Sequence, residues 1–156
     1  MIIQSGELQQ RERKYEGELP ASILELEGDP FLRAAGAIHY ELQAQRLAQE
    51  LLVRGALDVE LECRCARCAE WFRCAVRVPA FLRSYELVTE NESIDLTADL
   101  REDILLALPM NQLCSEGCRG RCVVCGINLN KQTCVACHAR QKTAAWDALD
   151  QLNLTE

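Results

Sequence analysis

Ten cysteines among 156 residues are the feature of this sequence that could do chemistry, and only two histidines accompany them. Four of the cysteines form two pairs, Cys122–Cys125 and Cys134–Cys137, with eight residues between the pairs. Two such loops facing each other supply four sulfur ligands to one tetrahedral metal ion. Gly126 allows the positive φ of a turn that directs backbone N–H groups at the sulfurs. The spacing predicts a metal site with Zn²⁺ as the ion, and an iron–sulfur cluster is the lesser alternative.

A second set of cysteines combines the Cys65–Cys68 pair with the Cys114–Cys118 pair, which lie far apart along the chain. They complete a second site if the turn that carries Cys65–Cys68 packs near the end of a helix over residues 97–108. An equal alternative places Cys114–Cys118 with Cys122–Cys125 around a single metal ion. Two further cysteines continue the apolar faces of strands, and we expect them to be small core residues: Cys63 and Cys74.

The environment of these thiols is predicted to be a reducing cytoplasm. The first ten residues lack the basic segment and apolar stretch of a secretory signal. No apolar run approaches the roughly 20 residues that span a bilayer, so no membrane association is expected. A thiol redox protein is an alternative, but a reactive pair needs a thiol of low pKa, typically at a helix N-terminus, and Cys65–Cys68 lies between predicted strands.

The charge of the chain is −7, which is unlike a non-specific nucleic-acid binder. The distribution is uneven, because residues 61–83 carry +3 and residues 114–142 carry +4. Both basic stretches coincide with cysteine pairs. Two interpretations stay open: a face that binds phosphates or a partner, or compensation for zinc-thiolate sites of charge about −2. The candidate RNA-binding or partner-binding residues are Arg67, Arg119, Arg121 and Lys131.

Alternation of apolar and polar residues predicts antiparallel strands with one buried face. The alternation runs through residues 38–44, 51–63 and 72–78, and a short strand is also indicated over residues 22–27. Residues 43–50 fit either a strand or a helical turn. We expect an α+β fold: an antiparallel sheet or partial barrel with a few helices and a C-terminal Cys-rich, zinc-ribbon-like segment.

The order of segments follows from these patterns. Residues 1–20 are predicted to be a loosely ordered lead-in, and residues 21–110 the sheet domain. Within that domain, residues 84–95 are expected to be a surface loop. Leu100, Ile104, Leu105 and Leu108 have helical spacing, so a helix is predicted over 97–108, with Thr97 as its N-cap and Pro109 ending it. Residues 111–140 form the Cys-rich metal-binding segment, and residues 141–156 a short amphipathic helix.

No catalytic motif is present. The sequence has no phosphate-binding glycine loop, no nucleophile elbow and no HExxH zinc motif. We therefore expect a protein that is not an enzyme.

Four stretches of this sequence together resemble the YceD family, the large ribosomal RNA subunit accumulation proteins of bacteria and plastids. They are CARCAE (65–70), IDL (94–96), EDILLALP (102–109) and CSEGCRGRCVVCGINLN (114–130). The resemblance extends over about residues 36–137. The family commonly has Leu where Arg121 stands and often Pro where Val123 stands, and neither difference disturbs the cysteine spacing.

The resemblance implies a cytoplasmic, non-enzymatic factor needed for 23S rRNA accumulation or processing. Its expected partner is a large-subunit rRNA precursor or a large-subunit ribosomal protein. Alternatives are a zinc-ribbon nucleic-acid-binding protein outside the ribosome, which the net acidity and the lack of exposed aromatic platforms disfavour, and a thiol redox protein. The sequence leaves the oligomeric state open.

Overall fold

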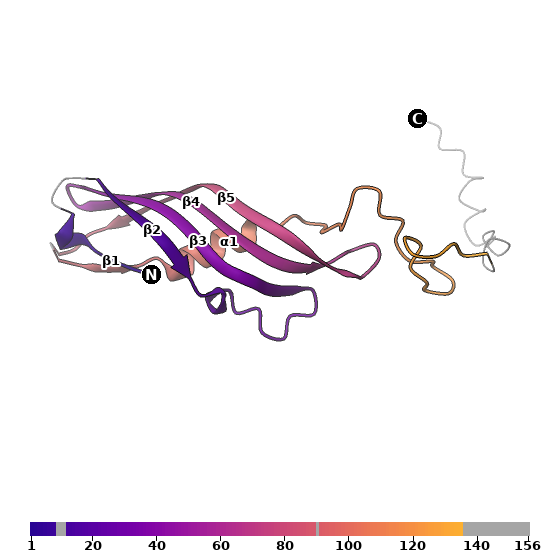
Figure 1. Cartoon of the computed structure of the whole chain (residues 1–156). Coiled ribbons are helices and arrows are strands. Elements are labelled where there is room, and N and C mark those ends of the chain that lie inside the picture. The colour runs from indigo at the N-terminus through magenta and orange to yellow at the C-terminus, as the bar shows by residue number, and fades with distance from the viewer. Residues whose placement is uncertain (9–11, 90, 136–156) are drawn as a thin grey trace, which may run out of the picture.

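The structure is a computed structural model, and it describes residues 1–8, 12–89 and 91–135. Cys137 and the helix expected over 141–156 lie outside the described residues. Most of the described chain is antiparallel sheet with one α-helix, and a Cys-rich segment continues from the end of the sheet (Figure 1).

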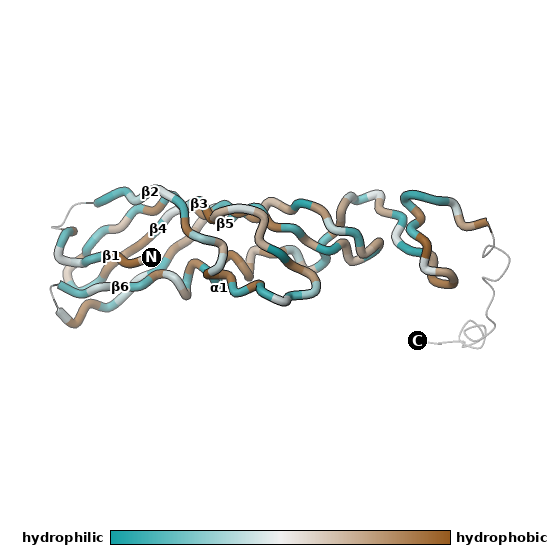
Figure 2. Tube along the Cα trace, turned by 60° about the horizontal axis from the view of Figure 1, so that its bottom comes forward, coloured by the Kyte–Doolittle hydropathy of each residue, from teal (hydrophilic) through white to brown (hydrophobic). Residues whose placement is uncertain are grey.

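Four long antiparallel strands form the main sheet in the order β2-β3-β4-β5. Their bounds are β2 Arg13–Leu19, β3 Leu32–Leu47, β4 Glu50–Arg64 and β5 Trp71–Glu86. Apolar and polar residues alternate along these strands (Figure 2), so one face of the sheet is buried and the other is wet. The predicted core faces over residues 38–44 and 51–63 are confirmed by the burial of Leu42, Leu57 and Leu61.

A second layer covers the buried face. It consists of a small sheet of β1 (Ile2–Gln4) and β6 (Ser93–Asp95), two 3-10 helices, η1 (Ser5–Glu7) and η2 (Ala21–Leu24), and helix α1 (Thr97–Leu106). Leu96, Leu100 and Ile104 are fully buried in the shared core with Phe81 of β5. Packing of apolar side chains from both layers therefore holds α1 against the sheet.

An ion-pair network also attaches α1 to β5. The Arg83 guanidinium lies 3.6 Å from an Asp99 oxygen and 3.5 Å from a Glu102 oxygen, and it donates to Asp103. Tyr85 donates a hydrogen bond to Asp99. Strand β5 and helix α1 are thus joined just before the chain enters the Cys-rich segment.

Several predicted elements differ from the structure. The lead-in over 1–20 is not loose, because its described residues form β1, η1 and β2, paired with residues far along the chain. Residues 22–27 are not a strand: the chain turns through η2, where Leu24 is fully buried and Ile23 and Leu26 pack against the core in part. Residues 43–50 are strand up to Leu47, then a turn at Ala48 with φ +53°.

Differences also surround the helix. The loop expected over 84–95 is shorter, because β5 continues to Glu86 and β6 pairs with β1. Helix α1 ends two residues earlier than predicted, at Leu106. Thr97 does not cap it: the Asp95 carboxylate accepts the Thr97 N–H at 3.0 Å, because the carboxylate reaches the first turn from β6.

The chain beyond α1 has little regular structure. Residues 107–135 contain no helix or strand, apart from an isolated bridge between Arg121 and Asn128. Within the described part of the chain, no helix has the length and apolarity needed to cross a membrane. The order of this segment must come from something other than sheet pairing or a large apolar core.

Candidate metal centres

The first candidate centre lies where the sheet meets the Cys-rich segment. Cys65 and Cys68 come from the turn between β4 and β5, and Cys114 and Cys118 follow α1. All four sulfur atoms lie within 4.8 Å of one another. The Cys65–Cys118 and Cys68–Cys114 Sγ–Sγ distances are both 3.7 Å. These two pairs are brought together, and Cys114 and Cys118 do not join the Cys122–Cys125 pair.

The distances fit a single ion held by four thiolates. A tetrahedral zinc site with Zn–S bonds of about 2.3 Å has sulfur atoms about 3.8 Å apart. A disulfide would bring two sulfurs to about 2.05 Å. A cubane iron–sulfur cluster places each thiolate on a different iron and needs a wider spacing than this quartet has. The donor set therefore suits one tetrahedral metal ion, and the geometry is compatible with zinc.

Backbone hydrogen bonds shape the turn that presents Cys65 and Cys68. The Cys65 N–H donates to Glu70 O at 2.9 Å, and the Ala69 N–H donates to Cys65 O at 2.9 Å. Ala69 has φ +58°, which tightens the return into β5. The Ala66 N–H donates to Gln112 O at 2.8 Å, and this bond ties the turn to the segment that carries the other two cysteines.

Local N–H groups favour the thiolate form of particular cysteines. Burial raises the pKa of Cys65, but backbone N–H groups of Cys114, Cys68 and Arg67 outweigh it and lower the pKa to about 6. The side-chain amide of Asn130 donates to Cys118 Sγ at 3.2 Å and lowers the pKa of that thiol. Thiolates are the form in which cysteine binds metal.

The second candidate centre lies further along the same segment. Cys122, Cys125 and Cys134 have their sulfur atoms within 4.8 Å of one another, with Cys134 3.7 Å from each of the other two. The Gly126 N–H donates to Cys122 O at 2.8 Å, and Gly126 has the expected positive φ of +74°. Backbone N–H groups of Cys125 and Val124 lower the pKa of Cys122 to about 6. The predicted fourth ligand, Cys137, lies outside the described residues.

The two centres are joined by polar contacts. Asn130, which lies in the loop between Cys125 and Cys134, accepts the Arg119 N–H at 2.7 Å and donates to Cys118 in the first centre. The Arg121 guanidinium donates to Cys68 O at 2.8 Å. Each centre therefore contributes to the arrangement of the other. Sequence reasoning gave Asn130 no role, although Asn130 is the last residue of the 114–130 stretch that carries the family resemblance.

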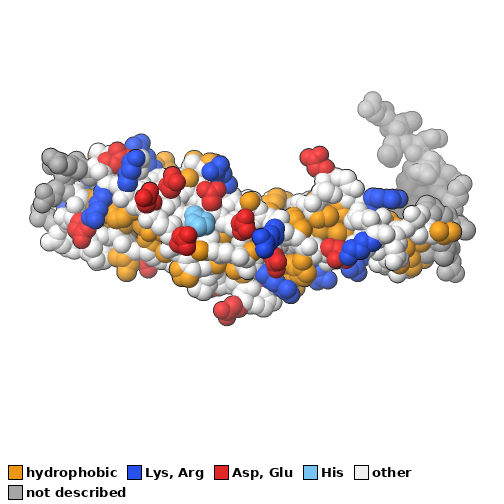
Figure 3. Space-filling model, in the orientation of Figure 1, with side chains coloured by type: hydrophobic (Ala, Val, Ile, Leu, Met, Phe, Trp, Pro, Cys, Tyr) orange, Lys and Arg blue, Asp and Glu red, His pale blue; other side chains and the backbone are white. Residues whose placement is uncertain are grey.

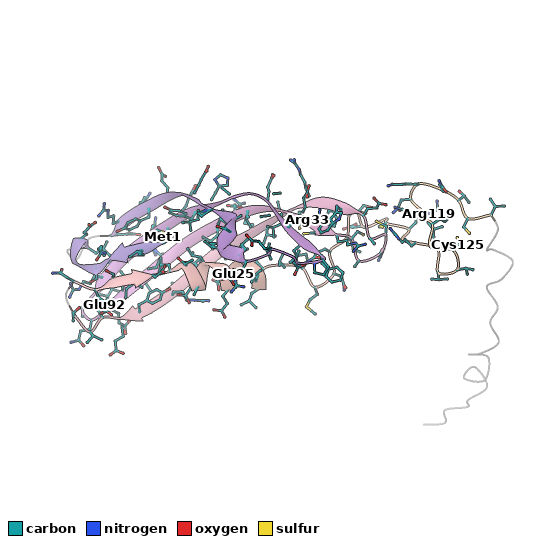
Figure 4. All side chains as sticks on the ribbon, turned by 90° about the horizontal axis from the view of Figure 1, so that it is seen from below. Met1, Glu25, Arg33, Glu92, Arg119 and Cys125 are labelled. Carbon is teal, nitrogen blue, oxygen red and sulfur yellow. The ribbon has the colours of Figure 1, made fainter. Side chains whose placement is uncertain are left out.

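The predicted binding residues are all exposed, but they differ in what they contact. Arg67 donates to the carbonyl oxygens of Glu116 and Cys118, both at 3.2 Å. The Lys131 Nζ atom lies 3.1 Å from a Glu70 carboxylate oxygen, so the charge of Lys131 is partly neutralised within the chain. Arg119 and Cys125 lie on the segment that projects from the sheet (Figure 4).

The two remaining cysteines lie on the sheet. Cys63 is fully buried, and burial together with the neighbouring Cys74 raises its pKa to about 12. Cys74 is half-buried against the same core. Neither belongs to the two sulfur clusters found among the described residues, in agreement with their prediction as small core residues.

Comparison with known proteins bears on the segment that carries most of these cysteines. The family model described as "Large ribosomal RNA subunit accumulation protein YceD" matches residues 82–153. The resemblance to the YceD family is confirmed. The YceD match contains six of the eight candidate ligands, and the Cys65–Cys68 pair precedes it.

A curated relative has the same family name. "Large ribosomal RNA subunit accumulation protein YCED homolog 1, chloroplastic" from Arabidopsis thaliana is 32% identical over 63 residues. The aligned part is 40% of this chain and 19% of the relative, so the chain spans about a fifth of that protein's length. No solved structure matches the chain.

Proposed function

We propose that this chain is a non-catalytic factor of large-subunit ribosome biogenesis that supports rRNA accumulation or processing in the cytoplasm. The observation that carries the proposal is the YceD match over the segment that contains six of the eight candidate ligands. The family name concerns the accumulation of large-subunit rRNA, and the chain contains no catalytic motif.

Zinc is the proposed metal at both centres, in a zinc-ribbon-like arrangement. Cys65, Cys68, Cys114 and Cys118 would hold one ion. Cys122, Cys125 and Cys134 would hold the other, with Cys137 as the fourth ligand. Bound zinc supplies folding free energy to a segment without a large core, and no redox chemistry. The metal would thereby fix the loops that present the arginines.

The proposed partner is the rRNA precursor, because the arginines around the first centre differ from those elsewhere on the sheet and α1. Figure 3 shows acidic and basic side chains mixed over the sheet. Six arginines of the sheet and α1 have a carboxylate within 4.0 Å: Arg13, Arg54, Arg73, Arg77, Arg83 and Arg101. Among the described residues, no carboxylate lies that close to Arg33, Arg64, Arg67, Arg119 or Arg121.

None of the guanidinium groups of these five arginines donates a hydrogen bond to a cysteine sulfur in the described part of the chain. The polar contacts of Arg64, Arg67 and Arg121 are to backbone carbonyl oxygens. The thiolates are instead satisfied by backbone N–H groups and by Asn130. Arg33, Arg67, Arg119 and Arg121 are exposed and Arg64 is half-buried, and their guanidinium groups keep N–H donors for phosphate oxygens, which Arg binds in a bidentate manner.

Co-sedimentation with ribosomal particles tests the proposal. We expect the tagged, metal-loaded chain to sediment with large-subunit precursors and a deletion strain to have reduced mature 23S rRNA. Arg119→Gln should weaken the association several-fold at low salt and make it less sensitive to added salt, because one phosphate contact is lost. Arg77→Gln, which removes a sheet arginine already paired with Asp58, is the matched control.

Two outcomes contradict the proposal. One is a normal 23S rRNA level in the deletion strain together with no sedimentation of the chain in particle fractions. The other is equal association of both arginine variants and the unchanged chain at every salt concentration, which would mean that the basic residues near the metal centres bind no phosphate.

A further inference from the structure

A hollow of about 570 Å³ lies beside the first metal centre, where three segments meet. Phe31 and Arg64 come from the end of the sheet, Cys65 and Ala66 from the metal-binding turn, and Met110 and Gln112 from the chain after α1. We infer that this hollow binds an unpaired base of single-stranded RNA. The inference rests on the proposed function and names the part of the RNA that binds in the hollow.

Two large apolar side chains at the hollow are exposed without apolar cover. Phe31 is 57% exposed and Met110 is 98% exposed. An aromatic face stacks with any base, and a thioether packs flexibly against an aromatic ring. The sequence interpretation that the chain lacks an exposed aromatic platform is therefore wrong at Phe31, because the platform is created by the turn at Asp29 rather than by a sequence pattern.

Hydrogen bonds hold the walls of the hollow in place. The Asp29 carboxylate accepts the Phe31 N–H at 2.7 Å and the Leu32 N–H at 2.8 Å. The Arg64 N–H donates to Phe31 O at 2.8 Å. The aromatic side chain thus projects from a backbone that is already fixed, which reduces the entropy lost when a base binds.

Polar groups at the hollow suit the edge of a base and its phosphate. The Gln112 side-chain amide has no hydrogen-bond partner among the described residues, so it can both donate to and accept from a base edge. Arg64 uses its Nε to reach Ala69 O at 3.1 Å, and its remaining N–H groups have no carboxylate within 4.0 Å. An anionic backbone entering the hollow would meet a free cation.

A stacked pair of a cation and an aromatic ring lies at the same end of the sheet as the hollow. The Arg33 guanidinium lies 4.0 Å from the centre of the Trp71 ring, and Trp71 is opposite Arg64 in the β4–β5 register. Arg33 lies where the sheet meets the Cys-rich segment (Figure 4). Alternation of aromatic and cationic groups is typical of surfaces that track single-stranded RNA, and it favours RNA over an apolar peptide segment.

Fluorescence anisotropy with the full-length, metal-loaded chain tests the inference. The probes are labelled oligo(A) and oligo(U) of about a dozen nucleotides, and an RNA duplex of equal length. We expect the single strands to bind more tightly than the duplex. Phe31→Ala should weaken single-strand binding about fivefold to a hundredfold, which is the effect of losing one stacked base. The dependence on salt should stay unchanged, because no charge is removed.

Two further variants serve as controls. Phe31→Trp keeps a stacking face and should retain affinity. Leu82→Ala removes an apolar side chain of equal exposure, 58%, from the sheet away from the hollow, and should leave binding unchanged. Both positions are exposed, so near-ultraviolet and far-ultraviolet circular dichroism should show intact folds.

Three outcomes overturn the inference. The first is that neither oligonucleotide binds to the chain. The second is that Phe31→Ala binds the oligonucleotides as tightly as the unchanged chain does. In both cases the proposed function stands if the chain still sediments with precursor particles. The third is that Phe31→Ala weakens sedimentation with particles but not oligonucleotide binding, which would make the hollow a protein-docking site.

Discussion

At the scale of single residues, the chemistry depends on groups that are not ligands themselves. The thiolates of both candidate centres accept hydrogen bonds from the backbone, and Cys118 also accepts one from the Asn130 side chain. Donors of this kind orient a ligand and stabilise its negative charge. Asn130 differs from the backbone donors because a substitution can remove it.

Removing the Asn130 amide should weaken metal binding at the first centre. We expect Asn130→Ala to lower its zinc affinity about 10- to 100-fold, as loss of a ligand's hydrogen-bond partner usually does. Titration of the zinc-loaded chain with a chromophoric chelator measures this affinity. Gln132→Ala, an exposed neighbour of similar size, should leave the titration unchanged. Identical curves for all three proteins would show that Asn130 has no part in metal binding.

At the scale of elements, strands β4 and β5 place the Cys65–Cys68 turn at one end of the sheet. The position of this turn depends on the register between the strands. The β4–β5 register shifts between Gly55 and Leu57, where one residue of β4 faces two of β5. A side chain at Gly55 would collide with Glu41 O and lie 2.8 Å from Leu42 Cα in the neighbouring strand. Close approach of two backbones explains glycine at this position.

Gly55→Ala should therefore destabilise the sheet by about 1–3 kcal/mol, which is typical of overpacking. The matched control is Gly36→Ala in β3, where an added Cβ meets nothing within 4 Å. That change should leave stability within about 1 kcal/mol or raise it slightly. Urea unfolding followed by circular dichroism measures both. Equal midpoints for the two variants would mean that the strands separate at Gly55 without cost.

At the scale of the whole molecule, two parts are stabilised in different ways. The sheet and α1 share a continuous apolar core, whereas residues 107–135 lack helix and strand apart from one bridge. Figure 1 shows the second part continuing beyond the end of the sheet. The first candidate centre takes two sulfurs from each part, so a metal ion held there would fasten the two parts together, and the second candidate centre is built from the projecting segment.

Loss of one cysteine ligand should show whether the Cys-rich segment depends on bound metal while the sheet depends on its apolar core. We expect about two zinc ions per unchanged chain and about one for Cys125→Ser, measured by elemental analysis. Limited proteolysis of the variant should cut the Cys-rich segment while the sheet stays protected. Cys74→Ser, which alters a cysteine outside both clusters, should retain both ions. Uniform digestion of Cys125→Ser along its whole length would mean that metal centres and sheet unfold as one unit.

Features that depend on neighbours in the chain could be predicted from the sequence alone. The alternation over residues 51–63 requires a strand with one buried face, because successive side chains point to opposite sides. The two-residue spacing of Cys122–Cys125 and the following Gly126 similarly predict the turn that brings these two sulfurs together. Helix α1 followed from the spacing of Leu100 and Ile104, although the first N–H group of the helix, that of Thr97, donates to Asp95 in another element.

Only the tertiary structure decided which cysteine pairs share a centre. Cys65 and Cys118 are 53 residues apart, and their sulfurs meet because β5 returns along β4 and α1 packs on the sheet. Local patterns cannot specify such a meeting, since it results from the summed geometry of every element between the two cysteines. The same reason kept the lead-in strands and the exposed Phe31 hidden in the sequence: each is defined by contacts with distant segments.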